Sequence, residues 1–247
     1  MKKLIIGNWK CNPLKTSEAL KIFNKIKKTA EASNFANTII CAPNIFLKDL
    51  LGVKGKIKIG AQNCSATEQG AYTGEVSAEM LKKIGCNYVI IGHSERRNLN
   101  RETDQEINQK LILALKNNLI PIFCLGENKK QRFDKSTFDV LKKQFQEGTI
   151  KIPESGLKKI IFAYEPIWSI GSGNFADPKL IEEVKIFLLN LMKKKNKKIE
   201  MKIIYGGSVN SKNVSDYFSK AKMDGVLVGG ASLNPIEFSK IIDKARS

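Results

Sequence analysis

Residues 160–174 read IIFAYEPIWSIGSGN, and this stretch decides the fold. Its first five residues form a near-continuous apolar run of strand length, which is typical of a parallel strand covered on both faces. The run ends in Glu165 and Pro166, and a loop with Trp168 and two glycines follows. A strand that only turned back would not need a carboxylate and a tryptophan at its end. We therefore expect a functional group at this strand end.

Seven further apolar runs of the same kind occur along the chain, at residues 4–7, 38–42, 57–61, 88–92, 120–125, 201–205 and 226–229. Stretches with the apolar spacing of helices lie between them, for example Ile181, Val184 and Leu188. Eight alternations at a spacing of about 30 residues predict repeated βαβ units. We expect a closed (β/α)8 barrel, with a doubly wound parallel sheet as the alternative, and a single domain over residues 1–247.

Local signals mark the ends of several predicted helices. Thr103 with Glu106 three residues later predicts a capping box. Asp177-Pro178 and Asn234-Pro235 each place a capping side chain before a proline that suits the first helical turn. Gly85 is expected to end the helix formed by AEMLKKI.

The chain is strongly basic, with 42 Lys and Arg against 24 Asp and Glu and a net charge of +18. Such a charge attracts anions, either small phosphates or nucleic acid. Most of the lysines fall on predicted helix faces or helix ends, which favours a solvated surface that steers an anionic substrate. Nucleic-acid binding is the minor alternative, because no aromatic-basic motif of a nucleic-acid reader accompanies the charge.

The cysteines and the N-terminus indicate a cytoplasmic protein. Five cysteines, an odd number with no C-x-x-C pair, argue against a disulfide framework or a zinc site. The N-terminus MKKLIIGNWKCN has too few apolar residues for a signal peptide, and no segment has the length of a membrane span.

In a (β/α)8 barrel the active site lies at the C-terminal ends of the strands, so the residues after each apolar run are the candidates. They are Asn8, Lys10, His93, Cys124, Glu127, Glu165, the YGGS segment at 205–208, and Gly229 with Gly230. The glycine pairs after the seventh and eighth strands occupy the usual phosphate site of this architecture, where backbone N–H groups approach a ligand closely. The alternative is that each pair is only a tight turn.

Three candidates carry chemistry. His93, the only histidine, precedes SERRN, which we expect to form a short helical turn whose dipole keeps the imidazole ring neutral. The alternative is that His93 has a structural role. A metal site at His93 is not expected, because the sequence offers no second ligand for the metal. Lys10 would stabilise negative charge on a phosphorylated anion, or is a surface lysine. Glu165 beside an enclosed phosphosugar suits a general base, or else forms an ion pair. The loop 166–176 has the composition of a lid with Trp168 at its first hinge, although this tryptophan could serve packing alone.

Together these residues resemble the triosephosphate isomerase family over essentially the whole chain. The resemblance rests on GNWKCN (7–12), GAQN (60–63), GAYTGEVS (70–77), IIGHSERR (90–97), FCLGE (123–127), AYEPIWSIGSG (163–173), YGGSV (205–209) and VGGASL (228–233), in order and at the family's spacing. It implies interconversion of dihydroxyacetone phosphate and glyceraldehyde 3-phosphate through an enediolate, in glycolysis and gluconeogenesis, without cofactor or metal.

The resemblance also implies roles for individual residues. Glu165 would move the proton between two carbons, His93 would polarise the oxygens, and Lys10 and Asn8 would give electrostatic support. The phosphate would be held by Gly171, Ser208, Gly229 and Gly230. The residues of the lid and its support would be Trp168, Tyr205, Glu95 and Cys124, with Tyr205 and Ser208 latching the closed lid and Glu95 buttressing Lys10. The family is usually a homodimer, in which the loop with Thr73 at its tip docks beside the partner's active site.

The sequence departs from the family pattern at several positions. Ser169 and Ser172 in the lid are mild changes, while Asn174-Phe175 at the second hinge is less usual. Asn100-Arg101 replaces a usual Phe-Gly, and Cys11 stands where the family often has methionine at the dimer interface. Two other functions remain open at this point: another phosphosugar enzyme on a barrel, and a basic binding module on the same scaffold.

Overall fold

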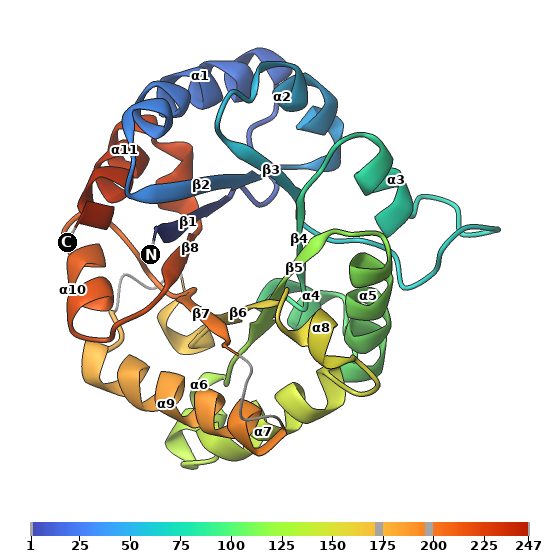
Figure 1. Cartoon of the computed structure of the whole chain (residues 1–247), viewed down its shortest axis with the longest axis vertical. Coiled ribbons are helices and arrows are strands. Elements are labelled where there is room, and N and C mark those ends of the chain that lie inside the picture. Colours follow the sequence, from blue (N-terminus) through green and yellow to red (C-terminus); the bar gives the residue numbers. More distant parts are fainter. Residues whose placement is uncertain (1, 171–174, 196–199, 247) are drawn as a thin grey trace.

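The computed structural model describes residues 2–170, 175–195 and 200–246, and its strands form a closed barrel. Eight parallel strands follow one another around the ring in chain order, and β1 pairs with both β2 and β8 (Figure 1). They are β1 (Lys3–Asn8), β2 (Ala36–Cys41), β3 (Lys58–Ala61), β4 (Tyr88–Ile91), β5 (Ile120–Leu125), β6 (Ile161–Tyr164), β7 (Lys202–Tyr205) and β8 (Gly225–Val228). The predicted barrel is confirmed, and the alternative of an open doubly wound sheet is wrong.

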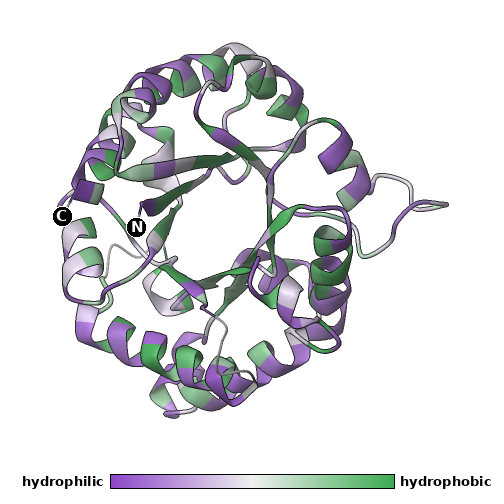
Figure 2. Ribbon diagram, viewed as in Figure 1, coloured by the Kyte–Doolittle hydropathy of each residue, from purple (hydrophilic) through white to green (hydrophobic). Residues whose placement is uncertain are grey.

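The strands are apolar on both faces because the barrel has two cores. Leu4 and Ile6 of β1 belong to the cluster that fills the barrel interior, whereas Ile5 between them packs in the larger cluster under the helices. Successive side chains of a strand point to opposite faces, so both sets have to be apolar. Figure 2 shows this as green strands inside a ring of helices whose purple residues face outward.

Each strand is followed by at least one α-helix. The helices are α1 (Thr16–Ala32), α2 (Leu47–Val53), α3 (Ala78–Lys83), α4 (Ser94–Leu99), α5 (Asp104–Lys116), α6 (Lys129–Phe133), α7 (Thr137–Gly148), α8 (Glu154–Leu157), α9 (Pro178–Lys195), α10 (Val214–Ser219) and α11 (Pro235–Asp243), with 3-10 turns η1 (Asn44–Phe46), η2 (Ile167–Ser169), η3 (Gly230–Leu233) and η4 (Lys244–Arg246). The long connections after β4 and β5 hold five helices between them.

The predicted helix ends are confirmed. Thr103 and Glu106 form a reciprocal capping box at the start of α5. The Asn234 side chain accepts from the N–H groups of the first turn of α11, and Asp177 accepts from the N–H of Lys179 at 2.9 Å. Gly85 follows α3 with φ +108°, a left-handed conformation that glycine adopts without strain.

Two further features of the described part of the chain bear on function. The loop between β3 and α3 projects from the barrel, as Figure 1 shows. None of the helices in the described residues is long and apolar enough to cross a membrane.

Candidate active site

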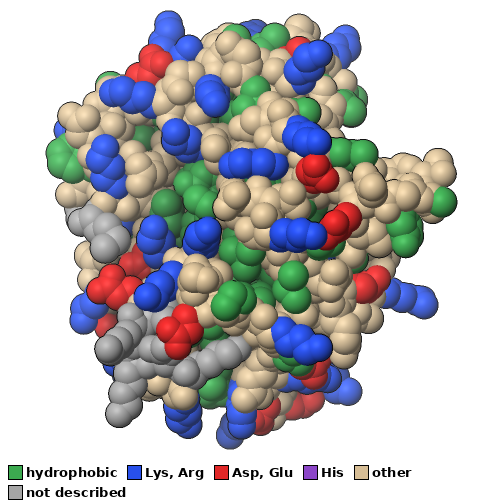
Figure 3. All heavy atoms as spheres, turned by 45° about the vertical axis from the view of Figure 1, so that its right-hand side comes forward, with side chains coloured by type: hydrophobic (Ala, Val, Ile, Leu, Met, Phe, Trp, Pro, Cys, Tyr) green, Lys and Arg blue, Asp and Glu red, His purple; other side chains and the backbone are tan. Residues whose placement is uncertain are grey.

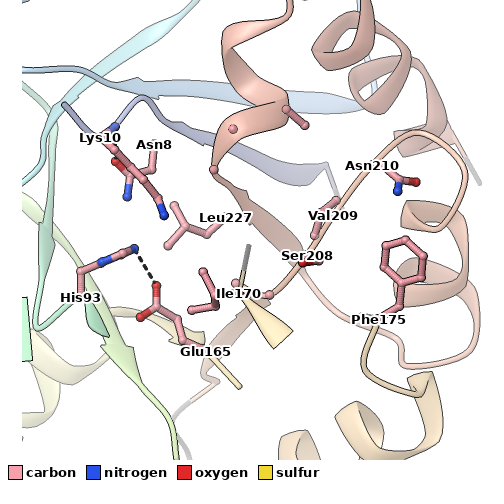
Figure 4. A pocket seen from close by; sticks show the side chains of 15 residues that line it. Asn8, Lys10, His93, Glu165, Ile170, Phe175, Ser208, Val209, Asn210 and Leu227 are labelled. Atoms are coloured by element: carbon pink, nitrogen blue, oxygen red, sulfur yellow. Dashed lines mark hydrogen bonds and ion pairs between the residues drawn. The ribbon is translucent and has the colours of Figure 1, made fainter. Parts of the chain in front are cut away.

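The predicted catalytic residues and the described phosphate-site candidates line one pocket of about 300 Å³ at the C-terminal ends of the strands (Figure 4), whereas Glu95, Cys124, Glu127, Trp168 and Tyr205 are not part of its lining. Its lining includes Asn8, Lys10, His93, Glu165, Ser208, Gly229 and Gly230. Ile170, Phe175, Val209, Asn210 and Leu227 also line it and had not been predicted as ligand contacts. Gly171, Ser172 and Asn174 lie outside the described residues.

The alternation of the strands puts two of the polar groups on the inner face. Ile6 faces the barrel interior, so Asn8, two residues later, faces the same axis at the mouth. Ala163 and Glu165 stand in the same relation after β6. Every second residue of a strand faces the barrel axis, so the row of interior side chains continues past the strand end into the pocket.

His93 is held in one tautomer. It lies at the N-terminus of α4, and its Nδ1 accepts a hydrogen bond from the N–H of Glu95 at 3.2 Å. A ring nitrogen that accepts carries no proton, so the proton of the neutral ring is on Nε2. That Nε2 faces the pocket and lies 3.2 Å from Oε1 of Glu165. The ring can therefore donate a proton or a hydrogen bond to a ligand oxygen.

The Glu165 carboxylate is enclosed, with only 1% of the residue exposed. Its Oε2 accepts from the N–H of Ser94 at 2.9 Å. Its Oε1 approaches His93 but makes no well-aligned hydrogen bond, so this oxygen keeps a lone pair for a proton. Gly206 makes room for the base, since a Cβ there would lie 2.9 Å from Cγ of Glu165.

Lys10 is fixed at the mouth by unusual backbone geometry. Its φ is +54°, a left-handed conformation that costs a non-glycine residue roughly 1–3 kcal/mol. Oδ1 of Asn8 accepts from the Lys10 N–H at 3.0 Å, and Nε2 of Gln62 donates to the Lys10 carbonyl at 2.9 Å. The ammonium pairs with Glu95 at 2.5 Å. Gln62 was not predicted as a functional residue, although it lies in the motif GAQN, because nothing in the sequence indicates that Lys10 has a left-handed backbone for Gln62 to hold.

The start of the loop that the sequence predicts to be a lid is anchored to Glu127. Its carboxylate, fully buried, accepts from Nε1 of Trp168 at 2.9 Å and from the hydroxyl of Tyr164 at 3.1 Å. Burial raises the pKa of this carboxyl, while the hydrogen bond from Trp168 lowers it. The sequence placed Glu127 at a strand end but gave it no role. Trp168 is thus held through a hydrogen bond in addition to its packing.

The predicted latch residues contact Ser169, which belongs to the loop predicted to be a lid. The Ser208 hydroxyl donates to the Ser169 carbonyl at 2.5 Å, and the hydroxyls of Tyr205 and Ser169 lie 3.3 Å apart. Cys124 is buried below the pocket, where burial, followed by the adjacent Glu165, raises the pKa of its thiol well above the usual value. Cys124 therefore packs beneath the base and does not line the pocket.

The fold and the pocket define a (β/α)8-barrel enzyme with a carboxylate and an imidazole beside a cation and glycine-rich loops. Within the described residues, no group of three His, Cys, Asp or Glu side chains is arranged to hold a metal ion.

Comparison with known proteins narrows this class. The family model described as triosephosphate isomerase matches residues 3–245. A triosephosphate isomerase of Alkaliphilus oremlandii is 42% identical over 249 residues, covering 98% of this chain and 99% of the relative; one of Aquifex aeolicus is 39% identical over 246 residues, with 98% and 99% covered. The crystal structure of triosephosphate isomerase from Bartonella henselae matches with a TM-score of 0.90 at 33% identity and 100% coverage of both chains. The chain belongs to the triosephosphate isomerase family.

Proposed function

We propose that this chain interconverts dihydroxyacetone phosphate and glyceraldehyde 3-phosphate, as an isomerase of glycolysis and gluconeogenesis, with Glu165 as the base. One observation carries the assignment of the base: Oε1 of Glu165 and Nε2 of His93 lie 3.2 Å apart in the pocket that also contains the Lys10 side chain. A ligand there meets a proton acceptor, a proton donor and a positive charge at once.

The geometry supports the following proton transfers. Glu165 takes the proton from the carbon beside the carbonyl, and the two electrons of that C–H bond form the enediolate double bond. His93 donates from Nε2 to the oxygen that becomes negative, and the Lys10 ammonium stabilises the same charge. In exchange, His93 takes up the hydroxyl proton of the other oxygen, and Glu165 returns its proton to the former carbonyl carbon, so the second C–O bond becomes the carbonyl. No electrons leave the substrate and no second reactant is consumed.

The phosphate group belongs on the opposite wall of the pocket, at Ser208, Gly229 and Gly230, with Gly171 as a fourth expected contact. η3 begins at Gly230, and the first N–H groups of a helix have no partner within it. Space for a ligand exists beside this residue, because a Cβ at Gly230 would meet nothing within 4 Å. These features support a phosphate site there, with the sugar carbons placed between it and Glu165.

The test is isomerisation of glyceraldehyde 3-phosphate in a coupled assay. Replacing Glu165 by Gln keeps the shape and removes the base, so we expect kcat to fall by about 10²- to 10⁴-fold. Glu183→Gln, an exposed carboxylate of α9, is the matched control and keeps full activity. Equal activity of the two variants would remove Glu165 from the mechanism; an inactive wild-type protein of normal fold would remove the isomerase assignment itself.

We further propose that the chain forms a homodimer through the side of the barrel that carries the projecting loop. Large apolar side chains are exposed on the connections after four adjacent strands: Leu14 after β1, Ile45 after β2, Tyr72 after β3 and Leu99 after β4. Exposed apolar groups gathered on one face are typical of a protein interface. Thr73, at the tip of the loop, and Cys11, which is exposed, lie on the same connections.

Light scattering of the wild type and of a Tyr72→Glu/Thr73→Glu variant tests the dimer. We expect twice the chain mass for the wild type and the mass of one chain for the variant, since charges on the loop tip would be buried in the interface. Glu substitutions at Phe133 and Lys135, far along the chain on α6 and the turn after it, serve as the control.

We propose the cytoplasm as the compartment, in keeping with a role in glycolysis.

A further inference from the structure

The end of the barrel opposite the active site contains two adjoining hollows, of about 200 Å³ and 390 Å³. They share Leu4, Asn37 and Lys202 in their linings, so they form one depression across the N-terminal ends of the strands. None of these residues belongs to the site described above. We call this depression the basal hollow.

The rim of the basal hollow is cationic. Lys2, Lys158, Lys159 and Lys202, all exposed, contribute to its lining. Among the described residues that line the two hollows, Asp224 is the one acidic residue. Its Oδ2 accepts from the N–H of Ile203 at 2.8 Å and its Oδ1 lies 3.5 Å from the Lys185 ammonium. The carboxylate is thus already engaged and leaves the rim lysines unbalanced.

Three other lysines at this end of the barrel donate hydrogen bonds to backbone carbonyls that end helices or loops. Lys3 donates to the carbonyl of Met223 at 2.8 Å, Lys56 to that of Glu31 at 2.8 Å, and Lys82 to that of Asn118 at 2.9 Å. By contrast, no hydrogen bond or ion pair joins the side chains of the four rim lysines to any part of the chain that the structure describes. Hydrogen bonds to backbone carbonyls therefore do not explain why these four lysines are present.

The floor of the basal hollow is apolar. Leu4, Ile161 and Leu119 are buried there, while Ile120 and the ring of Tyr88 are partly exposed. Figure 3 looks obliquely at this end of the molecule, where blue Lys and Arg side chains stand around green apolar ones. A charged rim over an apolar floor suits a ligand that has both an anionic part and a flat apolar part, and a volume of about 390 Å³ lies in the range of small-molecule sites.

We propose that the basal hollow binds a nucleoside triphosphate, with the phosphates on Lys158, Lys159 and Lys202 and the base against Tyr88 and Ile120. The phosphates are charge-assisted hydrogen-bond acceptors for the three ammonium groups. Asn37 and Asn118, which also line the hollow, supply amide donors and acceptors for the polar edge of the base. The site lies at the other end of the barrel from the isomerase pocket, so both can be occupied together.

The test is calorimetric titration with ATP at about 0.15 M ionic strength, where exposed charges more than about 8 Å apart are screened. We expect one ATP per chain and a Kd that rises by about tenfold or more in Lys159→Glu/Lys202→Glu, since two charge-assisted contacts are lost. Lys21→Glu/Lys25→Glu, two exposed lysines of α1, changes the net charge equally and leaves the Kd within about twofold of the wild type. Both double variants retain isomerase activity, which verifies their folds.

Two further titrations distinguish the basal hollow from the isomerase pocket and from a site that binds phosphate groups alone. Gly230→Asp places a carboxylate in the isomerase pocket, and ATP binding that disappears in this variant would assign the ATP to that pocket and overturn the proposal. Inorganic tripolyphosphate should bind at least several-fold more weakly than ATP; equal binding would overturn the role of the apolar floor. An unchanged Kd in Lys159→Glu/Lys202→Glu, or a single-stranded oligonucleotide that binds far more tightly than ATP, would overturn the assignment of a small-ligand site.

Discussion

Replacing Gly206 by alanine should displace the base without removing it. A Cβ at this position would lie 2.9 Å from Cγ of Glu165 and 3.3 Å from the carbonyl oxygen of Tyr164. Optimal carbon–carbon contacts begin near 3.5 Å, so the first distance is too short by about 0.6 Å. Because Gly206 does not have a left-handed φ, the substitution acts through these two contacts and not through backbone strain.

The size of the effect follows from the required displacement. A misplacement of 1 Å in an active site costs about 10²-fold in rate, so a shift of about 0.6 Å predicts a kcat lower by roughly 10- to 100-fold. The same crowding should lower the free energy of unfolding by about 1–3 kcal/mol. The Tyr164 carbonyl is backbone and accepts from the Gly206 N–H at 2.8 Å, so it cannot yield in place of the Glu165 side chain.

The assay is kcat and KM for isomerisation, together with urea unfolding of the same samples. Gly52→Ala is the control, because a Cβ there meets nothing within 4 Å and alanine favours its helix by about 1 kcal/mol. We expect unchanged kcat and slightly higher stability for that variant. A Gly206→Ala enzyme that is folded and within twofold of the wild-type kcat would refute the argument that this glycine sets the position of the base.

Three further predictions concern other parts of the chain. Arg101 has φ +56°, a left-handed conformation that strains an arginine but not a glycine. Arg101→Gly should therefore raise the free energy of unfolding by up to about 1 kcal/mol, because the relief of this strain exceeds the entropy that glycine loses on folding. Urea unfolding measures the change, and a loss of stability would contradict it. Burial raises the pKa of Glu127, so the Glu127 carboxyl binds its proton more tightly in the native state than in the unfolded state. This proton binding stabilises the native state fully below about pH 4.3, and the stabilisation is lost as the pH rises through the raised pKa. The stability of the wild type relative to Glu127→Gln should therefore fall with rising pH in urea unfolding, and a constant difference would show that the two states bind the proton alike. A thiol reagent should react first with the exposed Cys11 and inactivate the enzyme by splitting the proposed dimer, whereas Cys11→Ser should resist; retained activity and dimer mass after full modification of Cys11 would exclude this.

The sequence predicted the strands well because burial on both faces leaves a strong signal. All eight apolar runs became strands, and the predicted run at residues 120–125 coincides with β5. The other boundaries moved by one or two residues. Thr38, for example, was predicted to open a strand that begins at Ala36, because the ladder with β1 extends two residues further than the apolar run. Strand ends follow hydrogen-bond register, which hydrophobicity does not encode.

The polar groups of the site could be predicted, but not the contacts that hold them. Glu165, His93 and Lys10 were recognisable as unusual residues at strand ends. The left-handed backbone of Lys10 and its contact with Gln62 depend on segments about 50 residues apart in the chain, and no local pattern encodes such a contact. Arg101 is the converse case, since a departure from the family's glycine was visible in the sequence, while only the structure shows that its φ is positive.

The alternation of side chains along the strands accounts for the positions of Asn8, Glu165 and Gly229 in the pocket. Leu227 faces the interior, and Gly229, two residues later, continues that row into the pocket, as Asn8 and Glu165 do on their strands. Residues of the opposite parity point to the helices, where Tyr164 and Tyr205 are buried. Their hydroxyls therefore lie behind the pocket, where that of Tyr164 contacts Glu127 and that of Tyr205 contacts Ser169. On these strands, the alternation that divides the two cores thus also separates residues that line the pocket from tyrosines that contact the adjoining residues.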